Sequence, residues 1–309
     1  MQPLTNMAGI IAAAKQALPV RTAVVHPVSA AIMTSLAGAM AEGILDPVLV
    51  GPEKKIRAAA TEAGFDISSF RLVDAPHSHA AADAAVALAR AGEVEAIMKG
   101  ALSTDELMEA AVRKDTGIRT DRRLSHVFVM EVSSYPKLLL ITDAAINVEP
   151  DLTAKRDIAQ NAINLAHALG IEKPKLAILA AVEKVDQRFR STVDAAALCK
   201  MADRGQITGA VLDGPLAFDN AISREAAIAK GIVSPVSGEV DILLAPDIEA
   251  GNMIAKQLTY LADARTAGIV LGGRVPVILT SRSGNAFGRV VSIALAALVI
   301  RAKLKVPTA

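Results

Sequence analysis

Residues 276–301, PVILTSRSGNAFGRVVSIALAALVIR, contain a complete strand–loop–helix unit. An apolar strand is expected to end at Ser281-Arg282, and an apolar helix to begin a few residues later. This order places a hydroxyl and a guanidinium at the carboxyl end of a strand, before a helix N-terminus. A guanidinium matches the oxygens of a phosphate, and free N–H groups at a helix start add positive potential. The segment thus offers a place for a small oxyanion, although a capping Ser281 and a solvated Arg282 fit it equally well.

The same strand-then-helix order recurs along nearly the whole chain, and it predicts an α/β fold with a twisted, mostly parallel sheet. The exception is a pair of strands at 125–132 and 137–145, separated by Ser-Ser-Tyr-Pro, which predicts a local antiparallel hairpin. Strands are expected at 20–27, 47–52, 71–76, 94–100, 125–132, 137–145, 175–181, 207–215, 240–247, 267–273 and 275–281. Helices are expected near the N-terminus and at 29–43, 53–64, 78–92, 103–117, 153–169, 191–204, 217–230, 250–264 and 286–303.

Many of the predicted strands end in small or polar residues. Such residues terminate strands everywhere, but ligands of parallel sheets collect at the carboxyl ends of the strands. So many polar ends in one chain favour a shared ligand site. The ends in question are His26-Pro27, Gly51-Pro52, Lys99-Gly100, Asp143, Asp213-Gly214-Pro215, Pro246-Asp247, Gly272-Gly273 and Ser281-Arg282.

Composition excludes several classes of protein. The net charge is +1, aromatic residues make up 3%, and there is no Trp, which argues against a nucleic-acid partner. No stretch approaches 18 apolar residues, and the N-terminus lacks a signal-type pattern, so a cytoplasmic protein without a membrane span is expected. Cys199 is the single cysteine, which excludes internal disulfides and cysteine-rich zinc sites.

Several common catalytic motifs are missing. The sequence contains no GxGxxG after a strand, no GxxxxGK[ST] and no GxSxG, so a dinucleotide fingerprint, a nucleotide phosphate loop and a nucleophile elbow are not indicated. Cys199 lies in an Ala-rich helical run and is interpreted as a structural thiol. His77 and His79 near Asp74 lack further ligands at zinc spacing, so no metal is expected.

Longer blocks of sequence resemble the phosphate acetyl/butyryl transferase family, and its short butyryl type most of all. The resemblance runs from Val25 to about Ile300, and blocks in the same order are more specific than any single motif. The blocks are MKGALSTDELM (98–108), TGIRTDRRLSHVFVME (116–131), ITDAAINVEPDLTAKRDIAQNAI (141–163), LDGPLAFDNAIS (212–223), GEVDILLAPDIEAGNMIAKQL (238–258) and AGIVLGGRVPVILTSRSGNA (267–286).

The resemblance implies two α/β subdomains of the isocitrate/isopropylmalate dehydrogenase type with a cleft between them. The first would comprise residues 1–144 plus 272–309, and the second residues 145–271. The implied reaction is acyl-CoA plus phosphate giving acyl phosphate plus CoA, with an acetyl or butyryl group transferred directly in a ternary complex. Coenzyme A would be substrate and product, without any bound cofactor, and a homodimer or larger homo-oligomer is expected.

The resemblance also assigns roles to individual residues. Arg282 would hold the phosphate dianion, and Ser281 would donate a hydrogen bond to the thioester carbonyl, worth about 3–4 kcal/mol when fixed. Gly288 stands where acetyl enzymes have an Asp thought to manage the thiol proton, which leaves His126, Asp143 and Asp219 as candidate bases. The predicted catalytic residues are Ser281, Arg282, Asp219 and His126. The predicted substrate-binding residues are Lys99, Gly100, Thr104, Ser125, Asp143, Gly214, Pro215, Gly251 and Asn252.

Two alternatives stay open from the sequence. A metal- and NAD-dependent decarboxylating dehydrogenase has a related fold, although no acidic cluster on one helix face supports it. A catalytically decayed CoA-binding regulatory module would explain Gly288. A basic cluster at Arg113, Lys114, Arg119, Arg122 and Arg123 suits either CoA phosphates or a solvated loop.

Overall fold

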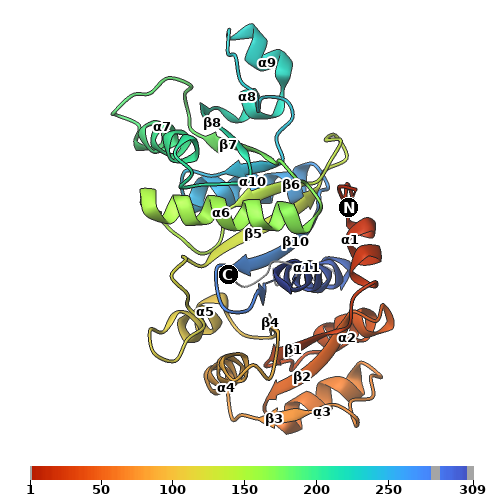
Figure 1. Cartoon of the computed structure of the whole chain (residues 1–309). Coiled ribbons are helices and arrows are strands. Elements are labelled where there is room, and N and C mark those ends of the chain that lie inside the picture. The colour runs from red at the N-terminus through yellow and green to blue at the C-terminus, as the bar shows by residue number, and fades with distance from the viewer. Residues whose placement is uncertain (1, 280–285, 305–309) are drawn as a thin grey trace. The chain divides into compact units, whose positions relative to one another are not determined.

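A computed structural model describes residues 2–279 and 286–304 of the chain (Figure 1). The chain forms two compact units. The terminal unit comprises Met7–Leu124 and Ala267–Ala309, and the central unit comprises Met1–Asn6 and Ser125–Thr266. Ser281 and Arg282 lie outside the described residues. No helix of the described residues is long and apolar enough to cross a membrane.

The terminal unit is built on a sheet whose inner strands are buried along most of their length. β1 (Val20–Val25) has one exposed residue, Arg21, as expected of a parallel strand covered on both faces. β11 lies beside β4, with Ile278 opposite Met98, so the C-terminal segment completes the sheet of the N-terminal strands. The order is β3 (Leu72–Asp74), β2 (Leu45–Gly51), β1, β4 (Ala96–Lys99), β11 (Val277–Ile278) and β10 (Arg265–Leu271).

Helices cover both faces of this sheet (Figure 1). On one side α11 packs against α1 and α2, and α2 contacts α3. On the other side α4 packs on β1, β2 and α5, and the small residues Ala81, Ala82 and Ala85 of α4 are fully buried there. The helices are α1 (Met7–Ala14), α2 (Ala30–Ala41), α3 (Glu53–Glu62), α4 (Ser78–Arg90), α5 (Thr104–Val112) and α11 (Ala286–Leu304).

The central unit contains the strands β5 (Ser125–Glu131), β6 (Leu139–Thr142), β9 (Ile242–Leu244), β7 (Lys175–Leu179) and β8 (Val211–Leu216), in that order. β5 and β6 are antiparallel, with Val127 opposite Thr142, and the remaining pairs are parallel. The beginning of β5 therefore lies at the same edge as the carboxyl ends of β6, β9, β7 and β8. The helices are α6 (Leu152–Ala168), α7 (Arg190–Asp203), α8 (Phe218–Ile222), α9 (Arg224–Ala229) and α10 (Ile248–Leu261).

The predicted α/β fold with a mostly parallel sheet and the hairpin at 125–145 are confirmed. The single helix predicted at 217–230 is wrong, because Ser223 has an extended backbone and caps a new helix through the N–H of Ala226. β10 and β11 form a second antiparallel pair that was not predicted. The units also divide at 124/125 and 266/267 rather than at 144/145 and 271/272, since β6 of the hairpin pairs with β9 of the central unit.

Candidate functional site

The carboxyl edge of the terminal sheet brings His26 and Lys99-Gly100 together. In the ladder Val25 of β1 is opposite Lys99 of β4, and the N–H groups of Gly100 and Ala101 donate to the carbonyls of Val25 and His26 at 2.9 Å. A Cβ on Gly100 would lie 2.2 Å from the carbonyl oxygen of Val25, so only glycine fits there. Gly100 therefore allows the chain to cross the end of β1 at close range.

Lys99 is buried at this edge, and its ammonium donates to the carbonyl of Leu102 at 2.8 Å. Thr104 follows as the first residue of α5 and is half-buried. Ser103 caps this helix by accepting from the N–H of Glu106, whose carboxylate accepts in return from the N–H of Ser103. The sequence thus places a cation and a helix N-terminus at the predicted oxyanion-binding edge.

Glu106 is held strongly in its ionised form. Its carboxylate accepts from the hydroxyl of Ser78 at 2.6 Å and from the N–H of Ser103 at 2.6 Å. These hydrogen bonds, the one from Ser78 foremost, lower the pKa of Glu106 to about 2. His79 lies 3.3 Å from the same carboxylate, and His77 caps α4. Both histidines are therefore occupied by contacts within the terminal unit.

At the carboxyl edge of the central unit, Asp143 organises the loop that follows β6. Its carboxylate accepts from the N–H groups of Ala145 at 2.9 Å and Ile146 at 3.1 Å, and from the side-chain amide of Asn147 at 2.6 Å. Burial raises the pKa of Asp143, and these hydrogen bonds oppose that rise. The observed contacts are those of a loop-forming residue, and its substrate contact stays a prediction.

Gly251 and Asn252 of α10 hold the same loop in place. A Cβ on Gly251 would lie 2.8 Å from the carbonyl oxygen of Asp143, so the helix approaches the loop at glycine range. The amide of Asn252 donates to the carbonyl of Ala144 at 3.1 Å. Asp247 caps α10 through the N–H of Ala250, as its position before the helix suggests.

Ser125 and His126 open β5 and are both fully buried. The hydroxyl of Ser125 accepts from the side-chain amide of Asn161 at 2.8 Å, which ties β5 to α6. The ring of His126 meets Phe128 edge-on, with centroids 4.3 Å apart. The hydroxyl of Thr142 donates to the carbonyl of His126 at 2.8 Å. The catalytic role of His126 stays a prediction.

Gly214 and Pro215 lie in the last part of β8, where a Cβ on Gly214 would come within 2.7 Å of the carbonyl oxygen of Ile178. Asp219 lies on α8, half exposed and 3.0 Å from the ammonium of Lys230. The hydrogen bond from Lys230 lowers the pKa of Asp219. A lowered pKa makes this carboxylate a weaker base, so its surroundings do not favour the proton-accepting role predicted for it.

Cys199 is half-buried, and burial raises the pKa of its thiol to about 11. It is therefore protonated at neutral pH, in agreement with a structural thiol. Within the described part of the chain, no group of three or more His, Cys, Asp or Glu side chains could hold a metal ion.

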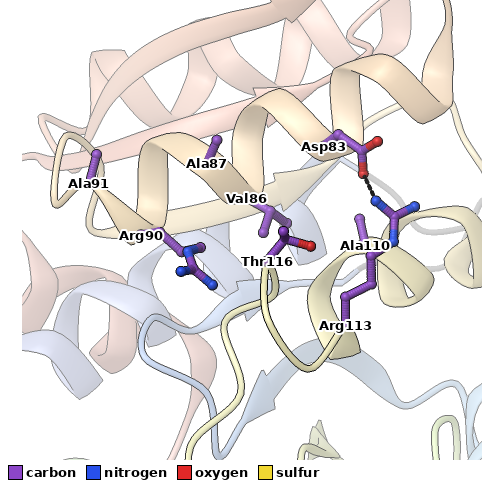
Figure 2. A pocket seen from close by; sticks show the side chains of 8 residues that line it. All are labelled: Asp83, Val86, Ala87, Arg90, Ala91, Ala110, Arg113 and Thr116. Carbon is purple, nitrogen blue, oxygen red and sulfur yellow. Dashed lines mark hydrogen bonds and ion pairs between the residues drawn. The ribbon is translucent and has the colours of Figure 1, made fainter.

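A pocket of about 540 Å³ opens between α4 and the segment after α5 (Figure 2). Arg113 reaches across it to Asp83 at 2.6 Å, while Arg90 donates to the carbonyls of Asp115 and Gly117. α4 and α5 both begin at the carboxyl edge of the sheet. The residues that line the pocket come from later turns of these helices and from the segment after α5, so the pocket lies away from Lys99. It is lined by Asp83, Val86, Ala87, Arg90, Ala91, Ala110, Arg113 and Thr116.

Sequence reasoning missed the part played by Ser78, Ser103 and Asn161 in holding site residues. The Ser103–Glu106 spacing of a capping box was an available signal. Nothing in the sequence pairs Asn161 with Ser125, because their contact joins two elements far apart in the chain.

Residues 78–297 match the family model described as phosphate acetyl/butaryl transferase. The chain is 57% identical over 292 residues to the phosphate acetyltransferase of Rhizobium meliloti, covering 94% of this chain and 92% of that protein. It is 44% identical over 268 residues to the phosphate butyryltransferase of Clostridium acetobutylicum, covering 87% and 89%.

Solved structures of similar fold include a branched-chain phosphotransacylase from Enterococcus faecalis V583, with a TM-score of 0.78 and 28% identity over 91% of this chain and 99% of that one. A phosphotransacetylase from Streptococcus pyogenes gives a TM-score of 0.82 over 96% and 99% of the two chains. Its identity of 21% makes it evidence for the fold alone.

Proposed function

This chain belongs to the phosphate acetyl/butyryl transferase family, and from that premise we propose that it exchanges acetyl groups between coenzyme A and inorganic phosphate. The observation that carries the choice of acetyl is the 57% identity to a phosphate acetyltransferase over 94% of the chain. The butyryltransferase relative, at 44%, is less similar. The reaction is acetyl-CoA plus phosphate giving acetyl phosphate plus CoA.

The acyl group passes directly to phosphate in a ternary complex of enzyme, acyl-CoA and phosphate. Arg282 holds the phosphate as a planar fork and turns one oxygen toward the thioester carbon. Ser281 donates a hydrogen bond to the carbonyl oxygen as negative charge develops on it. The raised pKa of Cys199 supports a route without a covalent acyl-enzyme, because a thiol with a pKa of about 11 is a poor nucleophile.

The residues predicted to bind substrate keep that role in this proposal. Coenzyme A takes part as substrate and product, without any resident cofactor. The buried ammonium of Lys99 at the end of β4 adds positive charge to the phosphate-binding edge. The other proposed substrate-binding residues are Gly100, Thr104, Ser125, Asp143, Gly214, Pro215, Gly251 and Asn252. A cytoplasmic location follows from these substrates as part of the same proposal.

The proposal includes a homodimer or larger homo-oligomer. α10 supports it, because Met253, Tyr260 and Leu261 are 66%, 63% and 79% exposed on one helix. Glu249 and Lys256 lie two turns apart on this helix and are both exposed, so an antiparallel copy of the helix would set opposite charges against each other. Sedimentation equilibrium that gives the monomer mass at micromolar concentration would contradict this part.

A thiol-release assay with phosphate and acetyl-, propionyl- or butyryl-CoA tests the function. We expect acetyl-CoA to give the highest kcat/KM, and Arg282→Ala to lower it by about 100-fold or more with a weaker dependence on phosphate. Arg188→Ala is the matched control, since that exposed arginine pairs with Asp186 on the surface. Wild-type kinetics in Arg282→Ala would remove this residue from the mechanism, and CoA binding without thiol release would favour a regulatory module.

A further inference from the structure

His26 has a backbone conformation that histidine rarely adopts. Its φ is 53°, in the left-handed region, and Pro27 follows, which restricts the residue further. Strained residues of this kind persist only where the surrounding structure enforces them, and they cluster at functional sites. The strained backbone therefore makes His26 a candidate for a role in the reaction proposed for this edge of the sheet.

The surroundings of His26 enforce this conformation from several sides. Its N–H donates to the carbonyl of Val50 at 2.7 Å, and its own carbonyl accepts from the N–H groups of Val28 and Ala101 at 2.9 Å each. Gly51 and Gly100 make room for His26. A Cβ on Gly51 would lie 3.2 Å from the Cα of His26, and a Cβ on Gly100 would lie 2.8 Å from the carbonyl oxygen of His26. Neighbours on both sides thus fix the direction in which the side chain leaves the strand.

The imidazole ring is also fixed in one tautomer. Its Nδ1 lies 2.9 Å from the carbonyl oxygen of Ala101. A carbonyl oxygen only accepts hydrogen bonds, so Nδ1 carries the proton and Nε2 of the neutral ring is a proton acceptor. His26 as a whole residue is half-buried, so it is partly accessible to solvent.

We propose that His26 is the catalytic base of this enzyme, accepting a proton from the attacking phosphate at Nε2. This inference rests on the proposed function, and it supplies a proton acceptor that Gly288 does not provide. His26 follows Val25, which is opposite Lys99 in the ladder between β1 and β4, so a base and a cation share the edge of the terminal sheet where an anion is expected to bind.

A phosphate oxygen forms a bond to the thioester carbon while its proton moves to Nε2 of His26. The tetrahedral intermediate collapses with breakage of the carbon–sulfur bond, and the electron pair leaves with the sulfur of coenzyme A. The proton on Nε2 then passes to that thiolate, which regenerates the neutral ring and releases the CoA thiol.

His26→Asn separates catalysis from structure. Asparagine tolerates the left-handed backbone, and its amide can donate to the carbonyl of Ala101 in place of Nδ1, but it has no group at the position of Nε2. We expect kcat to fall by about 100-fold while the KM for phosphate changes less than about threefold. His167→Gln is the matched control, because the ring of His167 also meets a backbone carbonyl, that of Gly209, through Nε2 at 2.7 Å. It is expected to keep wild-type activity.

Chemical rescue provides the second readout. Glycine accepts the backbone of His26 without strain, so His26→Gly should fold, and added imidazole should raise its kcat by about tenfold or more. A fully active His26→Asn, or a folded His26→Gly without rescue by imidazole, would overturn the inference while leaving the proposed function intact. A wild-type protein that releases no thiol from any of the three acyl-CoAs would instead refute the proposed function, and the role of His26 with it.

Discussion

The close backbone crossing at Gly100 leads to a quantitative prediction for Gly100→Ala. The added methyl would sit 2.2 Å from the carbonyl oxygen of Val25 and 2.8 Å from that of His26. Both contacts are with backbone atoms. Because Val25 of β1 is paired with β2 on one side and with β4 on the other, β1 cannot move away easily. The chain after Lys99 must therefore move away from β1.

The cost has two parts. Overpacking of this kind costs about 2 kcal/mol. Moving Gly100 and Ala101 also weakens their hydrogen bonds to Val25 and His26, which adds about 1 kcal/mol. We thus expect the free energy of unfolding to fall by about 3 kcal/mol in total.

Urea unfolding followed by far-UV circular dichroism measures this change as a lower midpoint at an unchanged slope. Gly38→Ala is the matched control, since the same methyl group in α2 would meet Val290 Cγ2 at an ordinary 3.6 Å. Removing a glycine from a helix interior should raise stability by about 0.5–1 kcal/mol. The reasoning fails if Gly100→Ala unfolds within about 0.5 kcal/mol of the wild type.

Two further predictions concern single titratable groups. Because hydrogen bonds from Ser78 and Ser103 lower the folded pKa of Glu106 from 4.5 to about 2, its contribution to stability is present above pH 4.5 and is lost as the pH falls toward 2. The urea midpoint should fall with decreasing pH less steeply for Glu106→Gln than for the wild type. Glu62→Gln, at an exposed position, is the control and should behave as the wild type does. Equal slopes for Glu106→Gln and the wild type would contradict the lowered pKa of Glu106. The half-buried thiol of Cys199, with a pKa of about 11, should react with iodoacetamide at pH 7.5 about tenfold more slowly than in the urea-unfolded chain. Cys199→Ser should keep its acyl-transfer rate within about twofold, and a larger loss would reopen covalent catalysis.

The alternation of strands and helices was predictable because apolar periodicity and chain punctuation are local properties. Strand β1, the hairpin β5–β6 and the caps at Ser103 and Asp247 all follow from residues near one another in sequence. The pairing of β10 with β11 also has a local signal in the sequence. The link between β10 and β11, residues 272–276, is too short for the crossover connection that two parallel neighbouring strands need. Such a short link indicates an antiparallel pair.

The site was harder to predict because its geometry depends on contacts between distant segments. The conformation of His26 is enforced by Val50 and Ala101, which belong to two other strand ends. Asp143 was predicted to contact substrate at a strand end, and its local partners Ala145, Ile146 and Asn147 are seen only in the structure. Residue type and spacing predicted which strand ends bind substrate, and that stays a prediction, while the partners of each side chain required coordinates.

Placing β11 and α11 with the N-terminal strands has a consequence for biosynthesis. A ribosome makes residues 1–276 before it makes β11, so one edge of β4 has no partner strand until then. The segment Ser125–Thr266 of the central unit can already form its own strand pairs before β11 is made. A stop codon ahead of β11 would therefore destabilise the sheet formed by β1 to β4, and such truncated products should accumulate as aggregates rather than as a stable fragment.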